Sequence, residues 1–153
     1  MSVTKAPPIP FGRHLGVAAR TSSDLLDKIL VDEAERFETW GVLNLIATGG
    51  PGKRRDELER ELVAGLQLAN AAPVLQLLGQ MERLGLIRFD AAPGGEGSVV
   101  ELTPAGQERF EHLLGVINEA SARALSDVDP EDVETTLRVL RTYREGALAL
   151  LAG

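Results

Sequence analysis

Apolar residues between positions 70 and 103 change their spacing in a way that predicts a helix followed by two strands. Asn70 is a suitable N-cap for this helix, and Pro73 suits its first turn, where a missing N–H costs least. Gly85 suits the left-handed residue that ends a helix. The apolar residues that recur at helical spacing, and so predict its buried face, are Val74, Leu77, Leu78, Met81 and Leu84.

Two short β-prone runs follow this helix, at residues 87–89 and 99–102. The glycine-rich stretch 93–97 between them predicts a turn or a flexible loop. Thr103 then offers an N-cap, with Pro104 at the first helical position, so a new helix is expected there. Helix, hairpin and helix in this order predict the second half of a winged helix-turn-helix.

Helical periodicity marks the rest of the chain. The first predicted helix has a heptad-like apolar seam, wide enough to pack on more than one neighbour. The last predicted helix begins at Asp129-Pro130 and stays apolar to its final turn, which indicates docking on another surface. The first predicted helix covers residues 11–29; between it and the last helix, further helices are predicted from 32–35 to 47, from 56 to 65 and from 104 onward.

Composition is that of an ordinary globular protein, with 44% hydrophobic and 25% charged residues. The absence of cysteine excludes disulfides and thiol chemistry. His14 and His112 are far apart in the sequence, so we expect no dedicated metal site. No apolar run approaches the ~20 residues of a membrane span, and no signal-peptide pattern opens the chain, so a cytoplasmic protein without membrane contact is expected.

Charge is the feature least typical of a nucleic-acid binder. The net charge is −7, whereas proteins that bind DNA normally neutralise phosphates with Lys and Arg. Residues 53–102 carry six basic and eight acidic groups, a net charge of −2. Residues 103–153 carry five basic and nine acidic groups, a net charge of −4. The segment expected to contact DNA is therefore less acidic than the C-terminal third, but it is not basic.

Two runs resemble the MarR family of bacterial transcription regulators. Residues 81–87 (MERLGLI) resemble the end of that family's recognition helix, and residues 102–106 (LTPAG) resemble the exit from its wing. Upstream, residues 40–47 and 56–58 resemble the two preceding helices. The resemblance covers roughly residues 11–151, nearly the whole chain.

The resemblance implies a mainly α-helical winged helix-turn-helix with a two-stranded wing and about six helices. It implies a homodimer whose dimerisation region is built from the N- and C-terminal helices, residues 11–33 and 104–153. Residues 34–103 would form the winged helix-turn-helix within a single domain, 11–153. The proline-rich residues 1–10 lack periodicity and are expected to form an extended arm.

Eight residues are candidates for DNA contact. The run Lys53-Arg54-Arg55 stands at a predicted helix start, where the dipole and free N–H groups also favour an anion; its alternative interpretation is a solvated basic loop. Asn and Gln side chains can bond adenine in the major groove, although such amides are equally common on any solvated helix face. Arg88 matches the base of the family's wing. The candidates on the predicted recognition helix are Asn70, Gln76, Gln80 and Arg83.

The wing departs from the family pattern. The family typically carries Asp and Arg at the wing tip, and the Arg enters the minor groove. Here residues 90–98 contain no Arg or Lys, and Glu96 should be repelled by phosphate. This departure favours a second hypothesis, a protein of this type with weakened DNA binding.

Ligand and catalytic chemistry have weaker signals. The resemblance implies a small aromatic or anionic effector between the dimer helices and the winged helix, where His14, Phe37 and Trp40 are candidates. The alternative for Phe37 and Trp40 is an ordinary core position. Ser, His and acidic residues fall in no nucleophile-elbow, phosphate-loop or metalloprotease pattern, so neither enzyme activity nor a cofactor is expected.

The sequence thus predicts a ligand-responsive homodimeric repressor that binds a palindromic operator in double-stranded DNA. The alternative is a MarR-like dimer with weakened DNA binding that acts through a protein partner or as a ligand-binding module.

Overall fold

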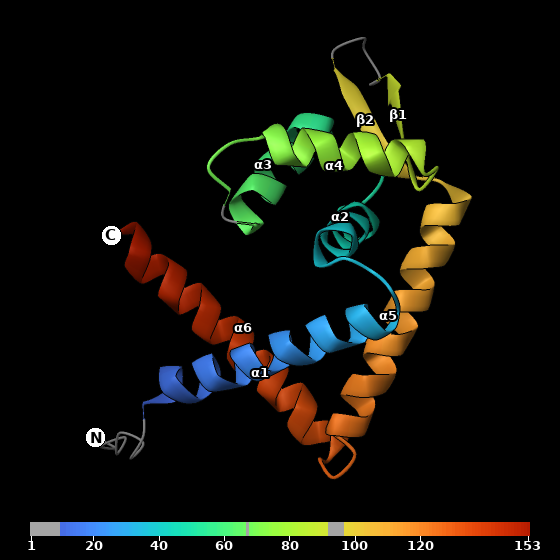
Figure 1. The fold of residues 1–153 in the computed structure, drawn as a ribbon. Helices are drawn as coiled ribbons and strands as arrows, with labels where there is room; N and C mark the ends of the chain where they lie inside the picture. Colours follow the sequence, from blue (N-terminus) through green and yellow to red (C-terminus); the bar gives the residue numbers. More distant parts are fainter. Residues whose placement is uncertain (1–9, 67, 92–96) are drawn as a thin grey trace. The chain divides into compact units, whose positions relative to one another are not determined.

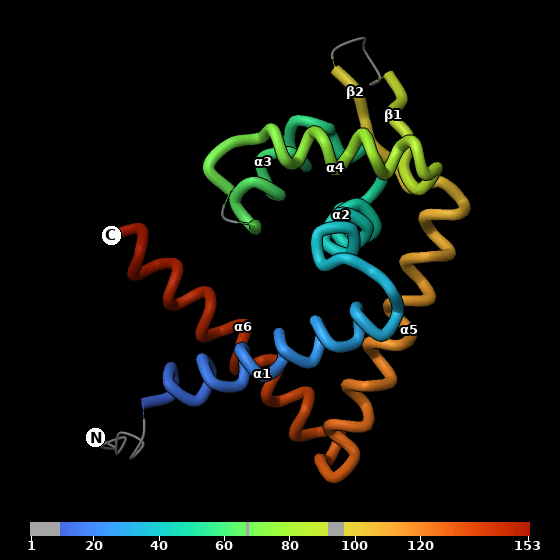
Figure 2. The backbone as a smooth tube through the Cα atoms, viewed as in Figure 1, coloured from blue at the N-terminus to red at the C-terminus, as the bar shows by residue number. Residues whose placement is uncertain are grey.

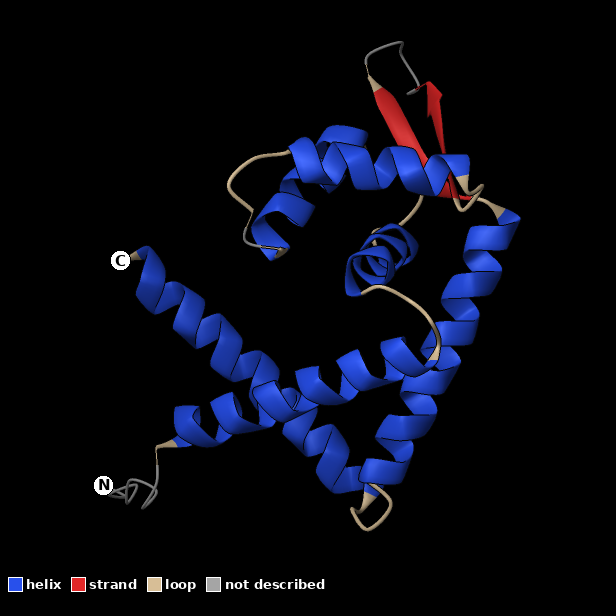
Figure 3. Cartoon of the chain, viewed as in Figure 1, coloured by secondary structure: helices blue, strands red, loops and turns tan. Residues whose placement is uncertain are grey.

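The computed structural model describes residues 10–66, 68–91 and 97–153 (Figure 1). The predicted N-terminal arm (apart from Pro10) and most of the predicted wing turn therefore lie outside the described residues. The mainly helical, winged fold class is confirmed, with a single antiparallel pair of strands in the described part of the chain (Figure 3). The elements are α1 (Phe11–Asp32), α2 (Phe37–Thr48), α3 (Arg55–Gly65), α4 (Ala72–Arg83), β1 (Ile87–Ala91), β2 (Ser98–Leu102), α5 (Pro104–Ala124) and α6 (Pro130–Ala152).

Contacts divide the chain into two compact units. The first, residues 1–117, holds α1 to α4, the two strands and most of α5. The second, residues 118–153, holds the end of α5 and all of α6. Each unit is described by itself below.

The hydrophobic core of the first unit is built around α2. Val42 and Leu43 are fully buried, and α2 contacts α3, α4 and β2. The tube in Figure 2 shows α2, in teal, nearly end-on below α4. Trp40 stacks on Phe110 of α5, with ring centroids 5.7 Å apart. The other buried members of this core are Leu30, Ile46, Leu58, Leu62, Val74, Leu78, Met81, Ile87, Val100 and Leu113.

Helix α4 forms as its apolar pattern predicts. Val74, Leu78 and Met81, spaced by four and three residues, are buried. The N-cap is Ala71 rather than the predicted Asn70, and no side chain caps it. Asn70 Oδ1 instead accepts a hydrogen bond from the Ala72 backbone N–H at 3.0 Å, which satisfies one free donor of the first turn. Gly85 has φ +71°, the left-handed conformation expected after a helix.

The prediction that Leu84 belongs to the buried face of this helix is wrong. Leu84 is the residue that follows the last turn of α4, and it is 65% exposed. Leu84 keeps helical backbone angles, φ −76° and ψ −5°, so its side chain follows the helical spacing, but at this end of α4 no described residue covers it.

Strands β1 and β2 form the wing, defined here as residues 87–102. They pair antiparallel, with Ile87 opposite Leu102 and Phe89 opposite Val100. Each strand is longer than its predicted β-prone run. The loop before α3 adds a short third edge, because Arg54 forms an isolated antiparallel bridge with Val99 and Lys53 O accepts a hydrogen bond from Val100 N–H at 2.9 Å.

The exit of the wing docks on the end of α4. The Thr103 N–H donates to Leu86 O at 3.1 Å, and the Thr103 hydroxyl donates to Gly85 O. The same hydroxyl accepts from the Gly106 N–H at 3.1 Å and so caps α5. A Cβ on Gly106 would lie 1.9 Å from Leu86 O, so only glycine fits there. Residues 81–87 and 102–106, the two runs with the family resemblance, therefore contact each other in the structure.

The turn between α1 and α2 is held by α5. Ala34 adopts φ 53°, a left-handed conformation that is uncommon for a residue with a side chain. The Arg109 side chain donates to Glu35 Oε2 at 2.9 Å and to the Glu33 carbonyl at 2.8 Å. His112 Nε2 lies 2.6 Å from Glu33 Oε2. These contacts fix the strained turn against the helix that leaves the wing.

Helices α1 and α6 carry apolar side chains that no described residue of their own unit covers fully. Only Ile29 and Leu30 of α1 are buried. In α6, all of whose residues the structure describes, no residue is buried, and Leu150 and Leu151 are 85% and 83% exposed. Asp129 caps α6 as predicted, since its Oδ1 accepts from the Glu131 N–H at 2.9 Å.

Among the described helices, none combines the length and the apolar character of a membrane span.

Replacing Gly106 with Ala tests the wing-exit contact. The new methyl would overlap backbone atoms, which cannot rotate away, so we expect a loss of about 3 kcal/mol in the free energy of unfolding. Gly115→Ala, in the same helix, is the matched control: its Cβ meets no described atom within 4 Å, and better helix propensity should stabilise by up to about 1 kcal/mol. Urea unfolding followed by circular dichroism measures both changes. Equal stabilities of the two variants would contradict the contact.

Candidate nucleic-acid interface

The outer side of α4 presents polar side chains. Gln76, Gln80 and Arg83 are exposed, opposite or beside the buried face. Asn70 is also exposed, but its Oδ1 accepts from the Ala72 N–H, which leaves its NH₂ group for other contacts. The structure thus brings the four candidate base-reading residues onto one helix and the turn before it. A helix with such a face fits the width of a DNA major groove.

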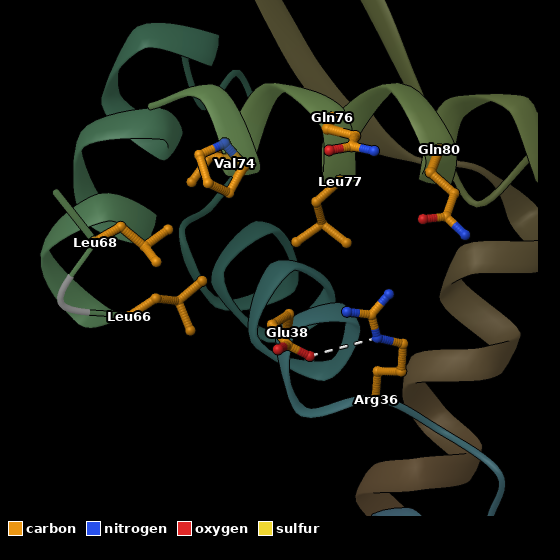
Figure 4. A pocket seen from close by; sticks show the side chains of 9 residues that line it. Arg36, Glu38, Leu66, Leu68, Val74, Gln76, Leu77 and Gln80 are labelled. Carbon is orange, nitrogen blue, oxygen red and sulfur yellow. Dashed lines mark ion pairs between the residues drawn. The ribbon is translucent and has the colours of Figure 1, made fainter. Parts of the chain in front are cut away.

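A cavity of about 350 Å³ lies beside α4, and two of these residues line it (Figure 4). Gln80 points down toward Arg36, the residue that precedes α2. Arg36 lies 3.6 Å from the Glu38 carboxylate. The remaining lining is mostly apolar and comes from the α3–α4 turn and α4: Leu66, Leu68, Pro73, Val74, Leu77 and Gln76. The cavity size and the mixed lining are typical of sites for small amphipathic molecules.

The three predicted ligand residues are not brought together at this cavity. Trp40 is 8% exposed and stacks on Phe110, as a core residue does. Phe37 begins α2 and is exposed, and His14 is exposed on α1. None of the three is among the described residues that line the cavity. Sequence spacing gave no signal for Arg36 and Glu38, because their place in the lining depends on how α2 packs under α4.

The basic run before α3 divides into three different environments. Lys53 Nζ lies 3.0 Å from Glu61, and its side chain is only 9% exposed, so it has little surface to offer a phosphate. Arg54 Nε bonds Asp56 Oδ1 at 3.1 Å, and its side chain remains 45% exposed. Arg55 Nε bonds Glu59 at 2.7 Å, and its guanidinium lies 4.7 Å from the centre of the Phe89 ring, a cation–π contact with the wing.

The other cations of this region are paired as well, with one exception. Arg88 bonds Glu101 at 2.7 Å and lies 3.1 Å from Asp90, and its pKa is raised by the Glu101 hydrogen bond first and by Asp90 next. Arg60 pairs with Asp56 at 3.3 Å. Arg83 alone among the six cations of residues 53–102 has no carboxylate partner in the described part of the chain, and it folds near Gly79.

Some of these carboxylate partners could be found from the sequence. Arg55–Glu59 and Asp56–Arg60 are four residues apart on one helix, the spacing at which side chains meet. Lys53–Glu61 and Arg88–Glu101 depend on a loop and on the strand register, which the sequence pattern does not specify. The described residues also hold no cluster of His, Asp and Glu that could bind a metal ion.

No protein-family model matches the sequence, and no curated protein matches it significantly. The fold, however, matches solved structures. A MarR family protein from Bacillus stearothermophilus has a TM-score of 0.72 at 18% identity, covering 90% of this chain and 92% of that chain. MepR, a transcription regulator of the Staphylococcus aureus multidrug efflux pump MepA, has a TM-score of 0.67 at 18% identity, covering 91% and 99%.

The chain has the MarR-type winged helix-turn-helix fold. In this MarR-type fold α3 and α4 are the helix-turn-helix, and β1 and β2 are the wing. A mutant of MepR bound to an oligodeoxyribonucleotide also matches, with a TM-score of 0.56 at 16% identity over 91% of this chain and 99% of that chain.

The Arg54–Asp56 pair makes a prediction about pH. The hydrogen bond from Arg54 holds the pKa of Asp56 below its ordinary value of 3.8, and Arg60 adds a smaller coulombic effect. Arg54→Gln should raise this pKa toward 3.8, and Arg60→Gln should raise it less. Because the pKa is lowered in the folded protein, the stabilisation is present above 3.8 and is lost as the pH falls through the lowered value. An NMR titration of the Asp56 carboxyl carbon measures both variants. A larger shift in the Arg60 variant would contradict the assignment.

Proposed function

We propose that this protein is a DNA-binding transcriptional regulator rather than an enzyme. The observation that carries the proposal is the polar, exposed outer side of α4 in a helix-turn-helix, with a wing directly after it. The matching solved structures include transcription regulators, and one of them is bound to DNA. The α4 amides would read base edges, and Arg54 and Arg83 would contact phosphates.

We propose that it acts as a homodimer. The apolar residues that α6 leaves exposed, and the sparsely buried α1, need a covering surface, and a second copy of the chain offers the same apolar residues. A two-fold dimer would place two α4 helices in successive major grooves, about 10 base pairs apart on a palindromic operator.

A small effector is the third part of the proposal. The cavity beside α4 offers Arg36, paired with Glu38, and two Gln amides to a polar group and a set of leucines to an apolar ring. This lining fits a small aromatic or anionic molecule. Because Gln76 and Gln80 belong both to the cavity and to the outer side of α4, an occupant would compete with base contacts. Bound at an operator that overlaps a promoter, the protein would act as a repressor. Binding of the effector would then release it from the DNA.

One observation favours the second hypothesis, a dimer of this fold with weakened DNA binding that acts through a protein partner or as a ligand-binding module. Five of the six cations in residues 53–102 are paired with carboxylates of the same chain. A phosphate would have to displace these partners, which reduces the gain from each contact.

The decisive experiment is selection of bound fragments from the source genome by the full-length protein, followed by titration of a selected duplex over a salt series. We expect micromolar or tighter binding and a shallow log–log salt slope of about −4, roughly four phosphates per dimer. A scrambled duplex of equal length is the control. Failure to bind any fragment at low salt, with folded protein, would favour the second hypothesis.

Two neighbouring substitutions in α6 test the dimer. Leu148→Asp places a charge on the apolar side of α6, whereas Ala149→Asp places the same charge about 100° around the helix. We expect dissociation to monomers for Leu148→Asp alone, measured by sedimentation equilibrium. A wild-type monomer at 50 μM or so, above the dissociation constants of stable dimers, would refute the proposal.

A further inference from the structure

The wing has almost no positive charge of its own to offer a nucleic acid. Between residues 86 and 103 the sequence contains one cation, Arg88. Arg88 is held between Asp90 and Glu101, at 3.1 and 2.7 Å, and both carboxylates belong to the wing. Its charge is therefore neutralised where it stands, so any cation at the outer end of the wing must come from another segment.

Arg54 comes from the loop before α3, and its backbone is part of the wing sheet. It forms the antiparallel bridge with Val99, and the adjacent Lys53 carbonyl accepts from the Val100 N–H at 2.9 Å. This pairing fixes where the Arg54 side chain starts. It is the physical link between a residue of the basic run and the strand that returns from the wing tip.

The Arg54 guanidinium lies against Gly97, one residue before β2. A Cβ on Gly97 would lie 3.2 Å from a terminal nitrogen of Arg54 and 3.9 Å from its central carbon. Gly97 also has φ +79°, a conformation that other residues rarely adopt. The glycine therefore gives the guanidinium room alongside the outer part of the wing.

Asp56 holds this guanidinium without using all of its donors. The hydrogen bond to Asp56 is made by Nε, while the terminal nitrogen lies beside Gly97. A guanidinium has five N–H donors, so the terminal groups remain for another acceptor. The side chain is 45% exposed, which leaves those groups accessible.

We propose that Arg54 is the cationic group that the wing presents to DNA, and that it binds a backbone phosphate beside the wing. The inference rests on the proposed DNA-binding function and names one contact in it. Strand β2 and Gly97 set the position of the guanidinium, and Asp56 limits its rotation. A terminal N–H pair in this position suits the planar, two-point recognition of a phosphate.

Arg54→Gln tests the proposal, and Arg60→Gln is its matched control. Both variants remove one positive charge and one partner of the same carboxylate, Asp56, but Arg60 belongs to α3 rather than to the loop that pairs with the wing. Fluorescence anisotropy with a duplex selected by the wild-type protein measures affinity over a salt series. We expect Arg54→Gln to weaken binding about tenfold for every duplex tested, and to make the salt slope shallower by about one for each phosphate that is no longer neutralised. Arg60→Gln should change affinity less than about threefold.

A third variant separates loss of the wing cation from a general effect on the fold. Ala91, the last residue of β1, is exposed and pairs with Ser98, so Ala91→Arg adds a cation to the outer end of the wing. In the Arg54→Gln background it should recover part of the affinity and of the salt slope, with thermal unfolding unchanged among the variants.

Equal losses of affinity in the Arg54 and Arg60 variants, or no loss in the Arg54 variant, would overturn the inference while leaving the proposed function intact. A wild-type protein that binds no DNA would overturn both.

Discussion

The close approach of Gly106 to the Leu86 carbonyl is the contact on which the arrangement of the winged helix depends. The wing leaves α4 at Leu86 and returns at Thr103, and the Thr103 hydroxyl joins both sides by bonding Gly85 O and the Gly106 N–H. Any side chain at position 106 would push the two backbones apart. This contact sets the angle at which the wing and α5 leave the end of α4. Arg109 and Glu35 then tie the α1–α2 turn to the same α5 helix.

The cations on the surface that would contact DNA are of two kinds: some are neutralised by carboxylates of the same chain, and others are free to bind a phosphate. Lys53 and Arg88 are held by carboxylates and serve the packing of the loop and the wing. Arg83 and the terminal nitrogens of Arg54 remain accessible. With so few free cations, the electrostatic attraction to any DNA sequence would be weak. Tight binding would then require base contacts by the α4 amides and simultaneous binding of both halves of the operator by the two subunits. The acidic character of the chain is then consistent with DNA binding that is selective rather than strong.

The sequence predicted the fold well because its signals are local. Helix periodicity, the Asp129 cap, Gly85 and Thr103-Pro104 each depend on residues a few positions apart, and each is confirmed. The predicted Asn70 N-cap is wrong by one residue, because α4 begins after Ala71. The candidate site was predicted less completely. Lys53 was predicted to face a phosphate but is paired with Glu61, and the cavity is lined by Arg36 and Glu38 rather than by Trp40. Those outcomes depend on packing between segments that are distant in sequence, which spacing alone does not encode.

Hydrogen exchange of the full-length protein, with and without its selected duplex, tests the central claim most directly. The account predicts that DNA slows amide exchange in residues 70–83 and 97–102, while α6 exchanges at the same rate in both samples. The duplex with a scrambled sequence should give little protection at the same concentration. Protection confined to α1 or α6, or no change in α4 under conditions where DNA is bound, would contradict the assignment of α4 and the wing as the DNA-contacting surface.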